Sequence, residues 1–250
     1  MTKPLAGRTV LVTRPADQSS SLVKLLDRLG AHAIVAPTIE IVPARSAALT
    51  TALRGLAAGE FAWITLTSRA TVEMLRERLE GPRAVDAKVA VIGEGTAEAF
   101  RRWTRRDPDL VPPTFTTVGL ARAFPRGHGR VLCARADIAP EGLEDALTVK
   151  GWTPTRVDAY RTRMPRRLPP EAREALRRGE VDAVTFTSAS TVRGFVGALG
   201  PKDRTAGRPK IVCIGPVTAS EARARGLAVH AVARPHTIEG IAAAVQRVLA

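Results

Sequence analysis

Serine, threonine and glycine recur where predicted strands end and predicted helices begin. The turns concerned read Thr13-Arg14-Pro15, Thr67-Ser68, Gly93-Glu94-Gly95-Thr96, Ala134-Arg135, Thr187-Ser188-Ala189-Ser190 and Gly215-Pro216-Val217-Thr218. In parallel α/β sheets, ligands bind beyond the carboxyl ends of the strands, where helix N-termini present free N–H groups. An anion at an exposed helix N-terminus gains only about 0.3–1 kcal/mol. Tight binding would therefore need several such turns acting together on a ligand with several anionic groups.

These residues also have a purely structural explanation. Serine and threonine are favoured N-caps of helices, so capping alone is the better explanation of any single turn. Five of the six turns, in both halves of the chain, nevertheless carry such residues, and together they favour a site that holds several anionic groups.

Motifs for cofactors and metals are missing from the sequence. Gly93-Glu94-Gly95 lacks the third glycine of a dinucleotide-binding fingerprint, and no Gly-Lys-Ser/Thr phosphate loop is present. The histidines lack the spacing of metal ligands and are interpreted as surface or loop residues: His32, His128, His230 and His236. We therefore predict no cofactor and no metal.

The chain carries a formal net charge of +14, with 38 lysines and arginines against 24 acidic residues. This excess indicates an anionic partner, although an arginine-rich composition could also supply it. Aromatic residues make up 4% of the chain, which leaves little for stacking on nucleic-acid bases. No apolar stretch approaches the roughly 18 residues of a membrane span, and the N-terminus lacks the apolar core of a signal peptide. We predict a cytoplasmic protein that binds neither nucleic acid nor membrane, with Cys133 and Cys213 as small buried residues.

The sequence contains an internal repeat with an offset of about 121 residues. Residues 10–14 align with 131–135, 65–68 with 185–188, and 92–93 with 214–215. Chance similarity between two alanine- and arginine-rich halves would not keep one register over the whole chain. The repeat therefore indicates a duplication, with a period too long for a solenoid unit.

Each copy alternates between short apolar runs and amphipathic segments of helical length. The strands predicted most clearly are 9–13, 61–66, 88–92, 130–134, 182–186 and 210–214, and weaker strands follow at 32–36, 109–111, 153–158 and 228–232. Parallel strands need long crossover connections, so this alternation predicts an α/β fold with doubly wound, flavodoxin-like parallel sheets. Residues 37–43 and 157–162 break the alternation, because each is extended and follows a strand directly. We interpret them as paired linkers.

In order and spacing, these motifs together resemble the uroporphyrinogen-III synthase family. The resemblance is carried by Val12-Thr13-Arg14-Pro15, the segment 37–43, Tyr160 with Thr162, Phe186-Thr187-Ser188-Ala189-Ser190, and Ile214-Gly215-Pro216-Val217-Thr218-Ala219. It extends over essentially the whole chain.

The resemblance implies two flavodoxin-like domains, joined by a two-stranded linker, with a cleft between them. Residues 1–36 and 166–250 would form one discontinuous domain, residues 44–157 the other, and 37–43 with 158–165 the linker. A simple tandem division near residue 126 is the less favoured alternative. The absence of a helix after 32–36 and after 153–158 agrees with the discontinuous arrangement.

The substrate of this family is hydroxymethylbilane, a linear tetrapyrrole with eight carboxylates. The reaction loses the terminal hydroxyl to give an azafulvene, which attacks the substituted position of ring D and forms a spiro intermediate that fragments and recloses. Without enzyme the substrate closes to the symmetrical isomer, so the protein must chiefly control shape. The implied activity is that of a cyclising lyase in haem biosynthesis.

Tyr160, the single tyrosine of the chain, matches the family tyrosine proposed to protonate the departing hydroxyl. A phenol can donate a proton at neutral pH. The alternative is a β-prone aromatic residue in an extended strand.

The remaining candidate residues are hydroxyl-bearing positions at the strand ends and one arginine. Contacts to substrate carboxylates are expected from Ser68, Thr96, Ser188 and Thr218, then from Thr187 and Ser190. Arg14 could pair with a carboxylate or be structural. The matching turn at 134–136 lacks the Thr-Arg-Pro motif, and Gly95 replaces the residue that corresponds to Val217.

Other functions stay open at this stage. A tetrapyrrole or anion sensor would bind without turnover, an arginine-driven nucleic-acid binder would show salt-dependent duplex affinity, and a flavoprotein would be yellow. We expect a monomer. A transient contact with hydroxymethylbilane synthase, which makes the substrate, is a further expectation.

Overall fold

The structure is a computed structural model that describes residues 3–200 and 209–249. The chain divides into two compact units: residues 1–40 with 163–250 form unit 1, and residues 41–162 form unit 2. Among the described residues, no helix combines the length and apolar character needed to cross a membrane.

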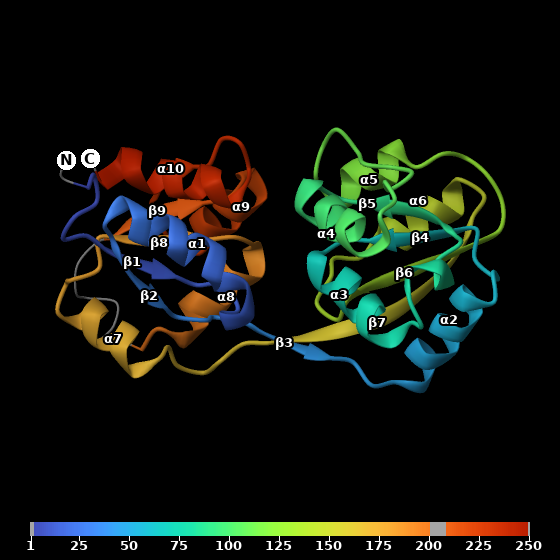
Figure 1. The fold of residues 1–250 in the computed structure, drawn as a ribbon, viewed down its shortest axis with the longest axis horizontal. Helices are drawn as coiled ribbons and strands as arrows, with labels where there is room; N and C mark the ends of the chain where they lie inside the picture. The colour runs from blue at the N-terminus through green and yellow to red at the C-terminus, as the bar shows by residue number, and fades with distance from the viewer. Residues whose placement is uncertain (1–2, 201–208, 250) are drawn as a thin grey trace. The chain divides into compact units, whose positions relative to one another are not determined.

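Unit 1 contains one five-stranded sheet in the order β10-β9-β8-β1-β2. Its elements along the chain are β1 (Thr9–Val12), α1 (Ala16–Leu29), β2 (His32–Val35), α7 (Pro170–Arg177), β8 (Ala183–Phe186), α8 (Ala189–Ala198), β9 (Lys210–Cys213), α9 (Pro216–Ala224), β10 (Val229–Val232) and α10 (Ile238–Leu249). All neighbouring strands pair in parallel. In Figure 1 the blue strands from the start of the chain lie beside the orange strands from its end.

Alternating residues of β1 divide the apolar core of unit 1 between the two faces of the sheet. Val10 and Val12 pack with helices α1 and α10, whereas Leu11 packs with α7, α8 and α9. This alternation follows from the period of two along a strand. Helix α1 fits the core face through Leu22 and Leu26, spaced one turn apart. It ends at Gly30, whose φ of 94° is left-handed and favours glycine.

Unit 2 repeats this architecture with the strand order β3-β7-β6-β4-β5. Its elements are β3 (Glu40–Pro43), α2 (Ala47–Ala57), β4 (Trp63–Leu66), α3 (Arg69–Arg78), the 3-10 turn η1 (Pro82–Ala84), β5 (Lys88–Val91), α4 (Glu94–Thr104), α5 (Thr117–Ala123), β6 (Arg130–Ala136), α6 (Leu143–Val149) and β7 (Thr153–Arg163). Helices α2, α3 and α4 cover one face of the sheet, and α5 with α6 cover the other. The prediction of doubly wound parallel sheets is therefore confirmed.

Each sheet is completed by both copies of the repeat. In unit 1, β1 and β2 come from the first copy and β8, β9 and β10 from the second, whereas in unit 2 β4 and β5 come from the first copy and β6 and β7 from the second. With the strands of each unit numbered as in one repeat, the sheet of unit 1 follows the flavodoxin-like order 2-1-3-4-5, and the sheet of unit 2 follows it for strands 2-1-3-4, with β3 added beside strand 2. In unit 2 the fifth position holds one parallel bridge, between Ala90 and Leu110, instead of the predicted strand 109–111. Prolines at 108, 112 and 113 shorten it, because proline has no N–H for a ladder.

Strand β3 is the edge neighbour of β7 in the sheet of unit 2. The backbone N–H of Ala44, directly after β3, donates to the carbonyl of Ala159 at 3.4 Å. The division into units falls after residues 40 and 162. The linker limits 37–43 and 158–165, and the cleft expected between the domains, stay predictions.

Candidate functional site

The candidate residues of unit 1 follow three adjacent strands. Arg14 comes after β1, Thr187 to Ser190 after β8, and Thr218 after β9. Because these parallel strands are neighbours in the sheet, their carboxyl ends meet at one edge. Unit 1 thus brings all its candidates to the same edge of its sheet.

Unit 2 places its candidates in the corresponding way. Ser68 follows β4, Thr96 lies in the first turn of α4 after β5, and Tyr160 lies near the carboxyl end of β7. Strand β6 stands between β4 and β7. All three residues therefore belong to the carboxyl-end edge of the second sheet.

Ser68 and Ser188 are N-caps of α3 and α8. The backbone N–H of Thr71 donates to Ser68 Oγ at 3.2 Å, and that of Thr191 donates to Ser188 Oγ at 3.2 Å. Ser188 Oγ also lies 2.9 Å from Ser190 Oγ. Capping accounts for the presence of both serines. Both side chains are only half-buried, so they remain accessible to a ligand.

Glycine, in contrast, caps α4 and α9. Gly93 and Gly215 have no side chain that could accept from the first-turn N–H groups. Thr96 and Thr218, the third residues of these helices, are only 8% and 4% exposed. The first turns of α4 and α9 therefore offer backbone N–H groups more readily than threonine hydroxyls, except at Pro216, which has no N–H. Helix N-termini of this kind suit carboxylates.

Arg14 and Thr187 differ in exposure. Arg14 is 6% exposed, whereas Thr187 is half-buried at the end of β8. The neighbouring Thr13 hydroxyl donates to the carbonyl of Thr185 at 2.7 Å and ties the ends of β1 and β8 together. Arg14 therefore lies buried beside a hydrogen bond that joins the carboxyl ends of β1 and β8.

A β-bulge places Tyr160. In the pairing of β6 with β7, Arg135 faces Asp158 but Ala136 faces Tyr160, so Ala159 is an extra residue. Strict alternation would send Ala159 and Tyr160 to opposite faces, yet both pack in the core beneath α2, α3 and α4. Bulges redirect side chains in this way and are frequent next to active sites.

The redirected Tyr160 reaches a residue 92 positions away in the sequence. Its hydroxyl donates to Ser68 Oγ at 2.9 Å, and Ser68 Oγ lies 3.1 Å from Thr71 Oγ1. Burial raises the pKa of the Tyr160 phenol above its usual value, the Ser68 hydroxyl lowers it in part, and the Asp137 carboxylate raises it further. The phenol is therefore protonated at neutral pH and can act as a proton donor.

Comparisons with known proteins identify the family of this chain. The family model "Uroporphyrinogen-III synthase HemD" matches residues 20–243. The uroporphyrinogen-III synthase of Synechococcus elongatus is 31% identical over 259 residues, which cover 98% of this chain and 97% of that protein. The chain belongs to the uroporphyrinogen-III synthase family.

Solved structures of uroporphyrinogen-III synthase share the fold. A mutant of the Thermus thermophilus protein matches with a TM-score of 0.68 and 24% identity over 97% of this chain and 98% of that one. The Helicobacter pylori protein matches with a TM-score of 0.58 and 16% identity over 94% and 96%. At these identities the likeness concerns the α/β fold with two parallel-sheet domains.

Two charged residues near the edge of unit 2 have partners that the sequence of this family member does not indicate. Arg135 is fully buried, and its Nη1 donates to both carboxylate oxygens of Glu144 at 3.0 and 2.9 Å. Asp137, in the turn after β6, accepts hydrogen bonds from two backbone N–H groups. The repeat aligns Arg135 with Arg14, which the sequence shows. It aligns Glu144, the partner of Arg135, with Val23, so the first copy gives no sign of this ion pair.

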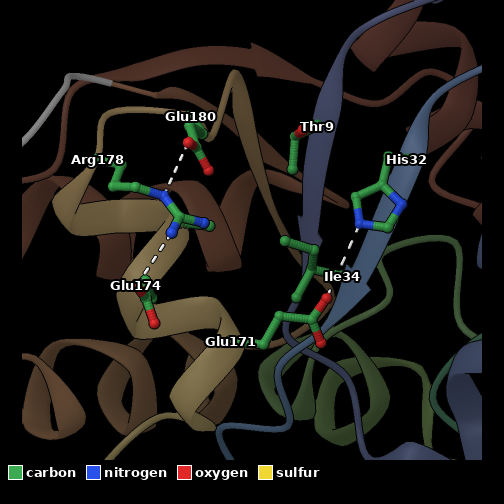
Figure 2. Close-up of a pocket in the computed structure, with 8 residues that line it drawn as sticks. Thr9, His32, Ile34, Glu171, Glu174, Arg178 and Glu180 are labelled. Atoms are coloured by element: carbon green, nitrogen blue, oxygen red, sulfur yellow. Dashed lines mark hydrogen bonds and ion pairs between the residues drawn. The ribbon is translucent and has the colours of Figure 1, made fainter.

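A cavity of about 350 Å³ lies elsewhere in unit 1, at the amino ends of β1 and β2 beside α7. It is lined by Thr9, His32, Ile34, Glu171, Glu174, Ala175, Arg178 and Glu180. Figure 2 shows Arg178 between Glu174 and Glu180, which it contacts at 3.0 and 2.8 Å. Because the cavity borders the amino ends of the strands, it is separate from the candidate site. Within residues 3–200 and 209–249, no group of three or more metal-ligating side chains could hold a metal ion.

Proposed function

We propose that this chain cyclises hydroxymethylbilane to uroporphyrinogen III, with loss of water and inversion of ring D through a spiro intermediate. Membership of the uroporphyrinogen-III synthase family supports this reaction. The observation that carries the chemistry is the position of the Tyr160 hydroxyl. A β-bulge directs it to the strand end, where it donates a hydrogen bond to Ser68, and its raised pKa keeps it protonated at neutral pH.

Tyr160 is the proton donor in this proposal. Its phenol protonates the terminal hydroxyl of the substrate, which leaves as water and produces the azafulvene. Ser68 accepts from the phenol before the reaction and can donate to the phenolate afterwards, because a serine hydroxyl both donates and accepts. The electron-rich substituted position of ring D then attacks the electrophilic azafulvene carbon, and the spiro intermediate fragments and recloses through the free α-carbon of ring D. The proton that this carbon loses on reclosure returns to the Tyr160 phenolate, so that the only product besides the macrocycle is water.

The substrate carboxylates are held at the strand-end turns. In unit 1 the contacts come from the edge that carries Arg14, Thr187, Ser188, Ser190 and Thr218, and in unit 2 from the edge that carries Ser68 and Thr96. The glycine-capped N-termini of α4 and α9 support this assignment, because they present first-turn N–H groups. The net charge of +14 favours a substrate with eight carboxylates.

Isomer selectivity arises in this proposal from positioning of the substrate. Holding reacting groups in one geometry can contribute many kcal/mol without a dedicated catalytic residue. We further propose that the enzyme is a cytoplasmic monomer, and that it receives its unstable substrate in a transient contact with hydroxymethylbilane synthase.

The decisive experiment supplies the protein with freshly generated hydroxymethylbilane and separates the oxidised products by isomer. The proposal expects the type III isomer to form faster than spontaneous closure. Formation of the symmetrical isomer alone, at the spontaneous rate, would remove the enzymatic assignment. Binding of the bilane without acceleration would indicate a sensor on the same fold.

Replacement of Tyr160 by phenylalanine is expected to lower kcat about 100-fold, the lower end of the usual contribution of a general acid. The product should remain the type III isomer, because phenylalanine keeps the ring and the positioning of the substrate does not depend on the hydroxyl. Single-turnover kinetics with isomer analysis measure both quantities. An unchanged kcat would contradict the role of Tyr160 as proton donor.

A further inference from the structure

Asp137 holds the main chain of β7 on both sides of residue 161. Its backbone N–H donates to the carbonyl of Tyr160 at 3.1 Å. Its Oδ1 accepts from the N–H of Thr162 at 2.9 Å and from the N–H of Ile138, also at 2.9 Å. The carboxylate therefore connects the turn after β6 to the segment that carries Tyr160.

This connection lies where the regular ladder ends. The last pair of β6 and β7 is Ala136 with Tyr160, whereas β7 continues to Arg163. No strand residue of β6 is left to accept from the N–H of Thr162, and an unpaired backbone N–H is costly when it is removed from water. The Asp137 carboxylate supplies that acceptor directly after the bulge.

The pair formed by Asp137 and Tyr160 is not a requirement of the fold. At the repeat offset of 121 residues, Asp137 corresponds to Ala16 and Tyr160 to Ile39. Unit 1 builds its parallel sheet without this pair, and its strand β2, which corresponds to the start of β7, ends at Val35, before Ile39. Unit 1 nevertheless has Ser188 where unit 2 has Ser68. The serine is thus shared by both units, while the tyrosine and the aspartate occur together in one.

We propose that Asp137 is a positioning residue for catalysis, which fixes the bulged end of β7 so that the Tyr160 hydroxyl points at Ser68. This inference rests on the proposed function, because the aligned hydroxyl matters only if Tyr160 donates a proton to the substrate. Misplacing a reacting group by about 1 Å can cost a hundredfold in rate.

The charge of Asp137 gives the proposal a direct readout. It adds to burial in raising the pKa of Tyr160, while Ser68 acts against both. The elements around Tyr160 carry further charges. On β6 these are Arg130 and Arg135, the latter ion-paired with Glu144; on α3 they are Arg69, Glu73, Arg76, Glu77 and Arg78; and on β7 they are Arg156, Asp158, Arg161 and Arg163. Of these charges, the Asp137 carboxylate raises the pKa of the phenol.

The test uses the full chain and titrates Tyr160 by the near-ultraviolet absorbance of its phenolate. Because Tyr160 is the single tyrosine, the signal belongs to one site. Asp137→Asn removes the charge but keeps an acceptor oxygen, so the titration midpoint should fall while kcat stays close to that of the wild type. Asp137→Ala removes the acceptor as well, so the midpoint should also fall and kcat should drop about tenfold with little change in KM.

Asp109→Asn is the matched control. Asp109 also accepts from a backbone N–H in unit 2, that of Val89 at 2.8 Å, but it has no effect on the phenol. In the Asp109→Asn variant, the titration midpoint of Tyr160 and the kcat should equal those of the wild type. Tryptophan fluorescence, recorded at each pH, shows whether unit 2 remains folded, since Trp63, Trp103 and Trp152 all lie in it.

The proposal is overturned if Asp137→Asn titrates at the wild-type midpoint, or if folded Asp137→Ala turns over at the wild-type kcat. Should Asp137→Ala fail to fold, the midpoint of Asp137→Asn decides alone. The titration needs no substrate, so a shifted midpoint in a protein that makes no type III isomer would reject the proposed function and leave the coupling of Asp137 to Tyr160 intact.

Discussion

Replacement of Glu144 by alanine is expected to destabilise unit 2 by about 3–5 kcal/mol, because it leaves a buried guanidinium without its carboxylate partner. The Arg135 side chain is 1% exposed and that of Glu144 is 17% exposed, so little water can replace the lost partner. Urea unfolding followed by tryptophan fluorescence measures this loss, since the three tryptophans report on unit 2.

The same strand supplies the control for this experiment. Arg130 at the start of β6 pairs with Glu60 at 2.6 Å, but the two side chains are 45% and 52% exposed. Glu60→Ala should therefore cost no more than about 1 kcal/mol. A double replacement, Arg135→Met with Glu144→Leu, should recover much of the lost stability, because it removes both buried charges. Equal losses for Glu144→Ala and Glu60→Ala would contradict the buried pair as a major contributor.

Replacement of Gly194 by alanine is expected to destabilise unit 1 by about 3 kcal/mol, near the upper range for overpacked sites. Gly194 lies in α8, and an added Cβ would stand 1.9 Å from the backbone carbonyl oxygen of Thr38. Thr38 cannot retreat easily, because its hydroxyl donates to the carbonyl of Thr191 on the same helix at 2.8 Å. An alanine at position 194 therefore requires either helix α8 or the segment around Thr38 to move.

Gly197→Ala is the matched control on the same helix. Outside its own helix, no described atom lies within 4 Å of the added Cβ, so alanine should be neutral or stabilise α8 by up to about 1 kcal/mol. Circular dichroism follows both units, whereas tryptophan fluorescence follows unit 2 alone. Gly194→Ala should shift the dichroism transition of unit 1 and leave the fluorescence transition unchanged. A shift of the fluorescence transition instead would show that the close approach in α8 does not act within unit 1.

Much of the fold could be predicted because local sequence patterns determine its strands and helices, and because these patterns occur in both copies of the repeat. Strands such as β1 and β8 are short apolar runs between turns, and the constant offset of the repeat indicates that both units share four matching strands. The segment 109–111 was misjudged because its apolar residues suggest a strand, whereas the flanking prolines limit it to one bridge.

The candidate site could be predicted only in part. The sequence predicts N-caps at Ser68 and Ser188, because each serine directly precedes a predicted helix, and both residues are N-caps. The hydrogen bond from Tyr160 to Ser68 depends on the β-bulge at Ala159. No glycine or proline in the sequence marks the position of this bulge. The support from Asp137 likewise depends on where β6 stops and β7 continues, a difference that arises only when the strands pair. Which residues bind substrate stays a prediction.

The construction of each sheet from both copies of the repeat bears on how this protein arose. A gene that encoded one copy would have produced a chain with strands for two half-sheets and no complete one. Two such chains, exchanging their halves, would have built both sheets as an obligate homodimer before the genes fused. In the fused chain the two copies can differ, and they do: one carries Tyr160 with Asp137 where the other has Ile39 and Ala16.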